Sequence, residues 1–319
     1  MKSSILILDA TGPVGLGAVK ATVEAGWPVV AVASDPQALE ALRRRYPEAR
    51  LQTVVGSVAD EAAAAALITE LRRFGQPFLG VIAALGVGDA RGRLLDQSSE
   101  LLRRSFDETV LPHLIAARHL LPWLAESGRN CGYVVIGGPG GRNPWAGYGH
   151  RSIAAAAIRM LSRVLHGEAQ AYAVRLQLLE VESPLRTDAN EKYACQQWPC
   201  ADHIGRKALA LLRHRNDASC NDAIVDYRHC SGHDTAEDDA ASDSDDVEAP
   251  PPRSSLTQDR GLTFPSGQAS SSASADPPQE MDSDASLLPA RCLQDVHKLL
   301  EHFSPRRSSP RKKNQERTK

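Results

Sequence analysis

The sequence predicts a doubly wound α/β domain with a parallel sheet, followed by a C-terminal tail of different composition. Short runs rich in Val, Ile and Leu alternate with longer Ala-, Leu- and Arg-rich segments of helical periodicity, which is the pattern of βαβ units. Gly or Pro stands at most junctions between these segments. The core-forming residues stop near Tyr227, and the chain beyond this point is dominated by polar residues.

The predicted strands are short, apolar and rich in β-branched residues, as expected for strands buried on both faces of a sheet. They are residues 4–8, 29–33, 51–55, 78–83, 132–136, 175–181 and 223–226. The predicted helices lie between them, where apolar residues recur every three to four positions. They are residues 15–25, 36–45, 61–74, 99–127, 149–171 and 202–213. Together these segments complete a doubly wound sheet with helices on both faces.

Composition and charge exclude several classes of protein. The formal net charge of −2 over 319 residues gives the whole chain no bulk preference for nucleic acid or a membrane surface. The apolar run at residues 5–8 is too short for a signal peptide, and no segment approaches the roughly 18 apolar residues of a membrane span. We therefore expect a cytoplasmic protein with reduced cysteines and no membrane span. Cys195, Cys200 and His203 match no compact zinc spacing, so no metal site is predicted.

The tail that follows the domain of residues 1–229 divides into three segments. Residues 230–285 hold acidic clusters and runs of Pro and Ser, which bury too little apolar surface to fold, and we expect a disordered linker. Residues 286–303 carry an apolar stripe that predicts a short amphipathic helix, either docked on a partner or on the domain, or only transiently formed. Residues 304–319 are basic and would bind a protein or nucleic-acid partner by charge, pair with the linker, or stay solvated.

A glycine-rich loop at residues 9–17 joins the first predicted strand to a helix. Glycines allow a tight turn and close backbone approach, and the helix N-terminus offers N–H groups and partial positive charge to a pyrophosphate. The alternative is a plain strand-to-helix turn that binds nothing. Because strand, loop and helix occur in the required order, the loop predicts a Rossmann-type domain that holds a dinucleotide. Its predicted contacts are Thr11, Gly12, Val14, Gly15, Leu16 and Gly17.

Residues 4–228 resemble the short-chain dehydrogenase/reductase family. The family's loop usually reads Thr-Gly-x-x-x-Gly-x-Gly, in which Gly15 and Gly17 match while Ala10 and Thr11 replace the first pair. Gly12 is expected to restore the tight turn. The resemblance implies a Rossmann fold, NAD or NADP as the cofactor, and a small carbonyl or alcohol as the substrate.

Other landmarks of the resembled family are altered. After the second strand the family carries an acidic residue for NAD or a basic one for NADP, whereas Ser34 accepts either ribose form and Asp35 is expected to open the next helix. The choice between NAD and NADP therefore stays open. The Asp that meets adenine falls on Ser57, and Ala-Ala-Leu-Gly at residues 83–86 replaces Asn-Asn-Ala-Gly. The resemblance thus adds Ser34, Ser57, Val58, Ala84 and Gly86 to the predicted cofactor-binding residues.

The family's catalytic residues are a Tyr that transfers a proton, a Lys four residues later, a Ser that polarises the substrate oxygen and an Asn in a proton relay. A phenol, with a reference pKa near 10, needs a nearby cation before it exchanges protons usefully at neutral pH. Tyr148 aligns with the Tyr and is the predicted catalytic residue. Ser152, Gly138 and Thr109 stand at the positions of the Lys, Ser and Asn. Tyr148 could equally be retained for packing at the start of a helix.

A replacement cation for Tyr148 is conceivable in Arg151 or His150. Consecutive helical residues, however, point about 100° apart, so neither simply substitutes for the i+4 position. The glycine-rich run at residues 137–141 has two interpretations. It is either an open loop that lets another ligand approach, or a loop whose sequence is unconstrained because no catalytic Ser is needed there.

Two functions follow from these residues. The first is a weak or atypical NAD(P)-dependent oxidoreductase with Tyr148 as proton donor. The second is a non-catalytic dinucleotide-binding regulatory or scaffold protein, a pseudoenzyme that acts through its tail, which the loss of cooperating residues favours. Residues 181–202 give no pattern that identifies a substrate. The family commonly assembles through the two helices predicted at 99–127 and 149–171, which implies a homo-oligomer.

Overall fold

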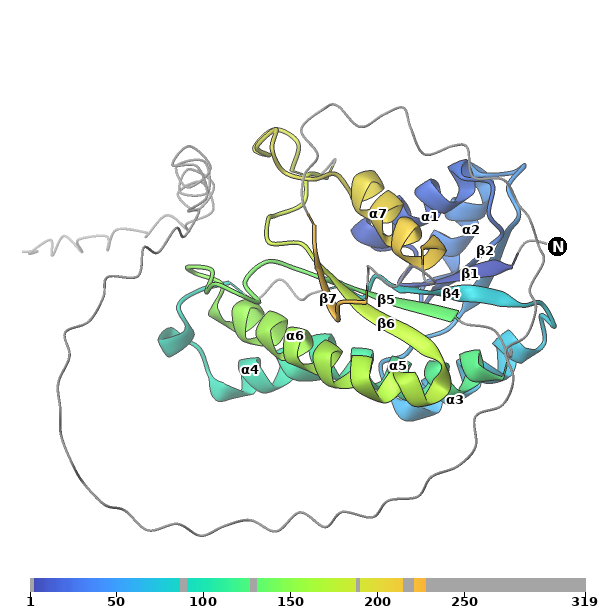
Figure 1. Ribbon diagram of the computed structural model, residues 1–319. Helices are drawn as coiled ribbons and strands as arrows, with labels where there is room; N and C mark the ends of the chain where they lie inside the picture. Colours follow the sequence, from blue (N-terminus) through green and yellow to red (C-terminus); the bar gives the residue numbers. More distant parts are fainter. Residues whose placement is uncertain (1–2, 87–90, 127–130, 188–189, 215–220, 228–319) are drawn as a thin grey trace, which may run out of the picture. The chain divides into compact units, whose positions relative to one another are not determined.

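The structure, a computed structural model, describes residues 3–86, 91–126, 131–187, 190–214 and 221–227. These residues form one sheet of parallel strands in the order β3-β2-β1-β4-β5-β6-β7, with helices on both faces (Figure 1). The doubly wound α/β prediction is therefore confirmed. The predicted linker, amphipathic helix and basic tail lie outside the described residues.

The strands are short apolar runs, and β1, β2, β4 and most of β5 and β6 are buried along their length. They are β1 (Ser4–Leu8), β2 (Val29–Ala33), β3 (Leu51–Val55), β4 (Phe78–Ala83), β5 (Cys131–Gly137), β6 (Val174–Glu180) and β7 (Ile224–Asp226). The first four coincide with the predicted strands, and each of the other three differs by one residue at one or both ends. The sequence pattern was sufficient here because each apolar run is bounded by Gly, Pro or a polar residue.

Helices cover the two faces of the sheet in two groups (Figure 1). One group is α1 (Pro13–Glu24), α2 (Pro36–Arg45) and α7 (Ala201–Arg213), and the other is α3 (Glu61–Arg72), α5 (Leu111–Ala125) and α6 (Gly149–Ala169). Side chains alternate along β1, so Ile5 and Ile7 pack toward the first group while Leu6 and Leu8 pack toward the second. Each face thus has its own hydrophobic core.

The helix predicted over residues 99–127 is helical without a break from Ser99 to Ala125, but it contains an irregularity that was not predicted. It consists of α4 (Ser99–Ser105), a π-helical turn η2 (Phe106–Val110) and α5, and the residues at both junctions keep right-handed helical backbone angles. Pro112 stands in the first turn of α5, where its missing N–H cannot bond to the preceding turn. The π-helical turn therefore lies directly before the point where the proline removes a helical hydrogen bond. None of the helices within the described residues is long and apolar enough to cross a membrane.

The strand order places one crevice at a defined point of the sheet. Because all strands are parallel, their carboxyl ends meet at one edge, and the order reverses between β1 and β4. Leu8, the last residue of β1, pairs with Val32 on one side and Ala83 on the other. In doubly wound sheets ligands bind in the crevice outside this switch point. The loops after β1 and β4 therefore define the candidate site.

Candidate functional site

The loop after β1 brings the N-terminus of α1 against the end of its own strand. A Cβ on Gly15 would lie 2.0 Å from the backbone oxygen of Asp9 and 2.8 Å from the Cα of Ala10, so only glycine fits. Gly12 is the N-cap of α1, and as a glycine it has no side chain to cap the helix. Val14 and Gly15 lie in the first turn, where N–H groups have no partner within the helix. This end of α1 can receive an anion.

Gly17 has a different role from the rest of the loop. A Cβ at this position would lie 2.2 Å from the backbone carbon of Ala201, and one on Gly205 would lie 2.4 Å from the backbone oxygen of Gly17. The two helices α1 and α7 therefore cross backbone to backbone. Lys20 and Asp202 form an ion pair one turn further along the same contact. Gly17 is buried in this helix crossing, whereas Thr11, Gly12, Val14 and Leu16 are only partly buried.

The other residues predicted to contact a cofactor all follow the carboxyl ends of strands, so the structure brings them to one edge. Ser34 is exposed after β2, and the Asp35 carboxylate accepts the N–H groups of Gln37 and Ala38 at 2.8 and 3.3 Å. Asp35 thus caps α2, as its place before a proline predicts. Ser34 is uncharged, and the Asp35 carboxylate, although exposed, is held at the N-terminus of α2 through Oδ1.

Most of the predicted cofactor-binding residues after β3 and β4 are buried or form hydrogen bonds within the protein. Ser57 accepts the N–H of Ala59 at 3.1 Å, so its hydroxyl turns back into its own loop, and Val58 is buried. Ala84 is buried and donates its N–H to the backbone oxygen of Leu8 at 3.3 Å, while Gly86 is exposed. The backbone of this loop, rather than its side chains, faces the switch point.

Asp9 is a site residue that the sequence analysis missed. It has a φ of 53°, in the left-handed region that glycine adopts readily and other residues seldom do. Its carboxylate accepts a hydrogen bond from the backbone N–H of Gly86, and Oδ2 lies 2.6 Å from the position a Cβ would take on Gly12. Burial raises the pKa of this carboxyl above its usual range, and the Gly86 bond offsets part of the rise. An acidic residue directly after β1 was the available signal.

Tyr148 lies immediately before α6, where its ring stacks on Trp145 with a centroid distance of 4.3 Å. The guanidinium carbon of Arg151 lies 5.6 Å from the centroid of each ring. Arg151 lies three residues after Tyr148, and residues three apart lie on the same side of a helix. Comparing only consecutive residues in the sequence leaves this spacing out. His150 is fully buried, and neither ring nitrogen has a hydrogen-bond partner within the described residues. Of these two residues, Arg151 is the one whose charged group lies over the Tyr148 ring.

Ser152, at the position of the family's Lys, closes the loop that carries Tyr148. Its Oγ accepts the Trp145 N–H at 2.9 Å and donates to the backbone oxygen of Tyr148 at 3.2 Å. The side chain is buried, and a Cβ on Gly140 would lie 2.8 Å from its Oγ. Ser152 is therefore a structural residue that faces the loop and supplies no cation.

Gly138 and Thr109 are the residues that the resemblance places at the family's Ser and Asn positions. Gly138 follows β5, and a Cβ there would meet nothing within 4 Å. Thr109 lies in the π-helical turn η2 and is buried. A side chain would fit at Gly138, but none is present to polarise a substrate oxygen.

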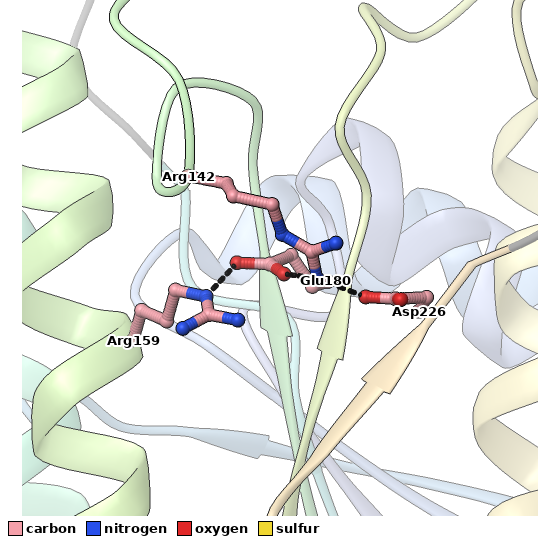
Figure 2. A network of polar contacts seen from close by, with 4 residues as sticks. All are labelled: Arg142, Arg159, Glu180 and Asp226. Carbon is pink, nitrogen blue, oxygen red and sulfur yellow. Dashed lines mark hydrogen bonds and ion pairs between the residues drawn. The ribbon is translucent and has the colours of Figure 1, made fainter. Parts of the chain in front are cut away.

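A polar network at the ends of β6 and β7 fixes the loop after β5 (Figure 2). Glu180 is 2% exposed and accepts hydrogen bonds from Arg142 at 2.7 Å and from Arg159 at 2.8 Å. Arg142 also pairs with Asp226. Burial, and then the charge of Glu180, raise the pKa of Glu182 above its usual range. The sequence analysis missed this network, although an acidic residue within an apolar strand was a signal.

The arrangement combines a backbone site for an anion at the switch point with a tyrosine hydroxyl on the neighbouring loop.

A family model described as "Enoyl-(Acyl carrier protein) reductase" matches residues 10–208. No curated protein matches the chain.

Solved structures with the same fold include several short-chain dehydrogenases. One from Streptomyces avermitilis is 23% identical, with a TM-score of 0.57, covering 72% of this chain and 89% of that one. One from Sphingobium yanoikuyae in complex with NADPH is 21% identical, with a TM-score of 0.56 and coverage of 67% and 85%. A short chain oxidoreductase from Pseudomonas aeruginosa, described as containing an atypical catalytic center, is 18% identical, with a TM-score of 0.61 and coverage of 72% and 98%.

Proposed function

Because the chain belongs to the short-chain dehydrogenase/reductase family, we propose that it binds NAD or NADP and oxidises or reduces a small alcohol or carbonyl at an atypical catalytic centre. The observation that carries this proposal is the approach of α1 to the end of β1 at Gly15. This approach leaves the first-turn N–H groups of Val14 and Gly15 at the switch point, where a pyrophosphate is stabilised by the helix N-terminus.

The proposed cofactor preference is weak. Ser34 is exposed and uncharged, and the Asp35 carboxylate is committed to the N-terminus of α2. A 2′-hydroxyl would meet only a carboxylate whose Oδ1 already caps α2, and a 2′-phosphate would find no cation from this pair. We expect NADH and NADPH to bind with affinities within about tenfold of each other, because a single hydrogen bond contributes about 1 kcal/mol.

The proposed chemistry assigns the proton transfer to Tyr148. The dinucleotide supplies or accepts the hydride when bound. Arg151 holds its positive charge over the face of the Tyr148 ring, with the guanidinium carbon 5.6 Å from the ring centroid. Gly138 offers the substrate oxygen no hydroxyl, and Ser152 offers no cation. Since each such group contributes typically about 10²–10⁴-fold, turnover is expected to be slow.

A second function, dinucleotide binding without turnover, is favoured by the contacts of Ser152. Its hydroxyl is used in the loop that positions Tyr148, so the loop is ordered by a residue that does no chemistry. In that case the chain serves as a regulatory or scaffold protein, with a protein or anionic partner for its tail. Deletion of residues 286–319 then abolishes partner retention while dinucleotide binding persists.

Titration and turnover of the full chain separate these functions. NADH and NADPH are titrated by fluorescence to millimolar concentration, and turnover is followed on a panel of carbonyl substrates. Tyr148→Phe should abolish turnover without loss of nucleotide binding, while Tyr172→Phe, which alters a tyrosine at the other end of α6, should leave both unchanged. Binding without Tyr148-dependent turnover supports the second function. Failure of both nucleotides to bind refutes both functions.

We also propose that the chain is a homo-oligomer that assembles through α5 and α6. Apolar side chains are exposed on both helices, at Leu111 and Leu114 of α5 and at Met160 and Val164 of α6. Exposed apolar groups on adjacent long helices are typical of an interface. Met160→Glu should lower the molar mass in solution measured by light scattering, whereas Leu95→Glu, at a more exposed leucine outside these helices, should not.

A further inference from the structure

A carboxylate stands beside the place where the proposed site would hold a pyrophosphate. Asp9 is the first residue after β1, and its φ of 53° is a conformation that a glycine would take without strain. An aspartate at this turn puts a side chain where a glycine would leave space. The backbone conformation of this turn therefore does not require an aspartate. The carboxylate of Asp9 must have another role than shaping the turn.

The carboxylate lies between the two loops of the switch point. Its Oδ2 is 2.6 Å from the Cβ position of Gly12 and 3.4 Å from that of Gly86, and it accepts the Gly86 N–H. Gly12 is the N-cap of α1, so the carboxylate lies beside the same helix N-terminus that would receive the pyrophosphate. Two anions at one helix end compete for its positive potential and repel each other.

The charge of Asp9 has no cationic partner in the described part of the chain, where no Lys, Arg or His forms an ion pair with it. The first turn of α1 contains no charged residue, and Lys20, further along the helix, is paired with Asp202. Desolvation disfavours the ionised carboxyl, in keeping with a negative charge that its surroundings do little to balance.

We infer that Asp9 sets the affinity of the dinucleotide site, because its carboxylate opposes the pyrophosphate at the N-terminus of α1. This inference rests on the proposed dinucleotide binding and deepens it. Since the pyrophosphate is common to both cofactors, Asp9 weakens NADH and NADPH by the same factor. Its effect is thereby distinct from that of Ser34, which lies where the ribose is expected and would act on the two cofactors unequally.

Two substitutions test the inference in the full chain. Asp9→Asn keeps the size of the side chain, and asparagine tolerates the left-handed conformation, while Asp9→Gly removes the side chain. Dissociation constants for NADH and NADPH are measured by isothermal titration, and thermal unfolding shows that each variant is folded. Both variants should bind both cofactors at least about tenfold more tightly than the unaltered chain.

The matched control is Asp96→Asn, which removes an exposed carboxylate from the 3₁₀ turn η1 (Leu94–Asp96) and should leave both dissociation constants unchanged. Equal affinities of the unaltered chain and the Asp9 variants overturn the inference and leave the proposed function standing. Weaker binding by Asp9→Asn also overturns it, since the carboxylate then serves the ligand as an acceptor. If no form of the chain binds either nucleotide, the proposed function fails, and the inference fails with it.

Discussion

The loop after β1 and the loop after β5 lie at the same edge of the sheet but are held in different ways. In the first, backbone approaches backbone, and a Cβ on Gly15 would meet a carbonyl oxygen at 2.0 Å. In the second, a Cβ on Gly138 would meet nothing within 4 Å, and the loop is held by the side chains of Ser152 and Arg142. Folding alone therefore requires the glycine of the first loop. At Gly138, by contrast, packing does not require glycine, and only a catalytic role would require a particular side chain.

Under the proposed function, this difference explains why the glycines of the first loop are kept while Gly138 and Ser152 stand where the resemblance places catalytic residues. Gly15 and Gly17 serve the packing of α1 on its strand and on α7, so they are needed whether or not a ligand binds. Catalytic side chains have no such second role, and Ser152 stands at one of their positions with a structural function of its own.

Glu180→Ala tests whether side chains hold the loop after β5. Removing this 2% exposed carboxylate leaves Arg142 and Arg159 without their shared partner. Breaking a buried ion pair from one side costs about 3–5 kcal/mol, and we expect a loss of this size in the free energy of unfolding measured in urea. Asp226→Asn is the control, because its 42% exposed carboxylate should contribute less than about 1 kcal/mol. Equal losses in the two variants would contradict the assignment.

Gly15→Ala tests the backbone packing of the first loop. The added methyl group would meet the backbone oxygen of Asp9 and the Cα of Ala10, neither of which can turn away as a side chain would. Overpacking of this kind costs about 1–3 kcal/mol or more, and we expect the urea midpoint to fall accordingly. The added methyl should also weaken dinucleotide binding by displacing α1. A variant as stable as the unaltered chain would show that the loop does not need glycine.

Ser152→Ala tests whether Ser152 is structural. The substitution leaves the Trp145 N–H without its 2.9 Å acceptor in a partly buried loop, which costs about 1–3 kcal/mol. We expect the midpoint of unfolding to fall and any turnover to drop as the Tyr148 loop loosens. Ser162→Ala removes a buried hydroxyl from the middle of α6 as a control for the loss of an oxygen atom. If Ser152→Ala changes turnover but not stability, the serine acts chemically.

Most of the fold could be predicted from the sequence because its signals are local. The runs that form β1, β2, β3 and β4 are apolar segments with clear limits, and their predicted bounds agree with the structure. The segment around Pro112 could not be predicted as well. A proline marks a point where a helical hydrogen bond is missing, but no residue pattern before it indicates a π-helical turn.

The site was less predictable because its contacts join residues far apart in the chain. Arg142 and Arg159 meet Glu180 across 38 and 21 residues, and no periodicity pairs them. Asp9 reaches the loop after β4 only because β1 and β4 are neighbours in the sheet. By contrast, the Asp35 cap was predictable, since its partners are two and three residues away.

Gly138→Ser gives the smallest expected effect and the sharpest contrast with Gly15→Ala. The position has open space and no left-handed backbone, so the free energy of unfolding should change by less than about 0.5 kcal/mol. Turnover should not rise either, because the restored hydroxyl lacks a cation at Ser152 and cooperating catalytic groups act as a unit. Steady-state assays with NADPH and a carbonyl panel provide the measurement. A rise of more than about tenfold would mean that Arg151 already supplies the charge Tyr148 needs, and that the missing hydroxyl alone limits the reaction.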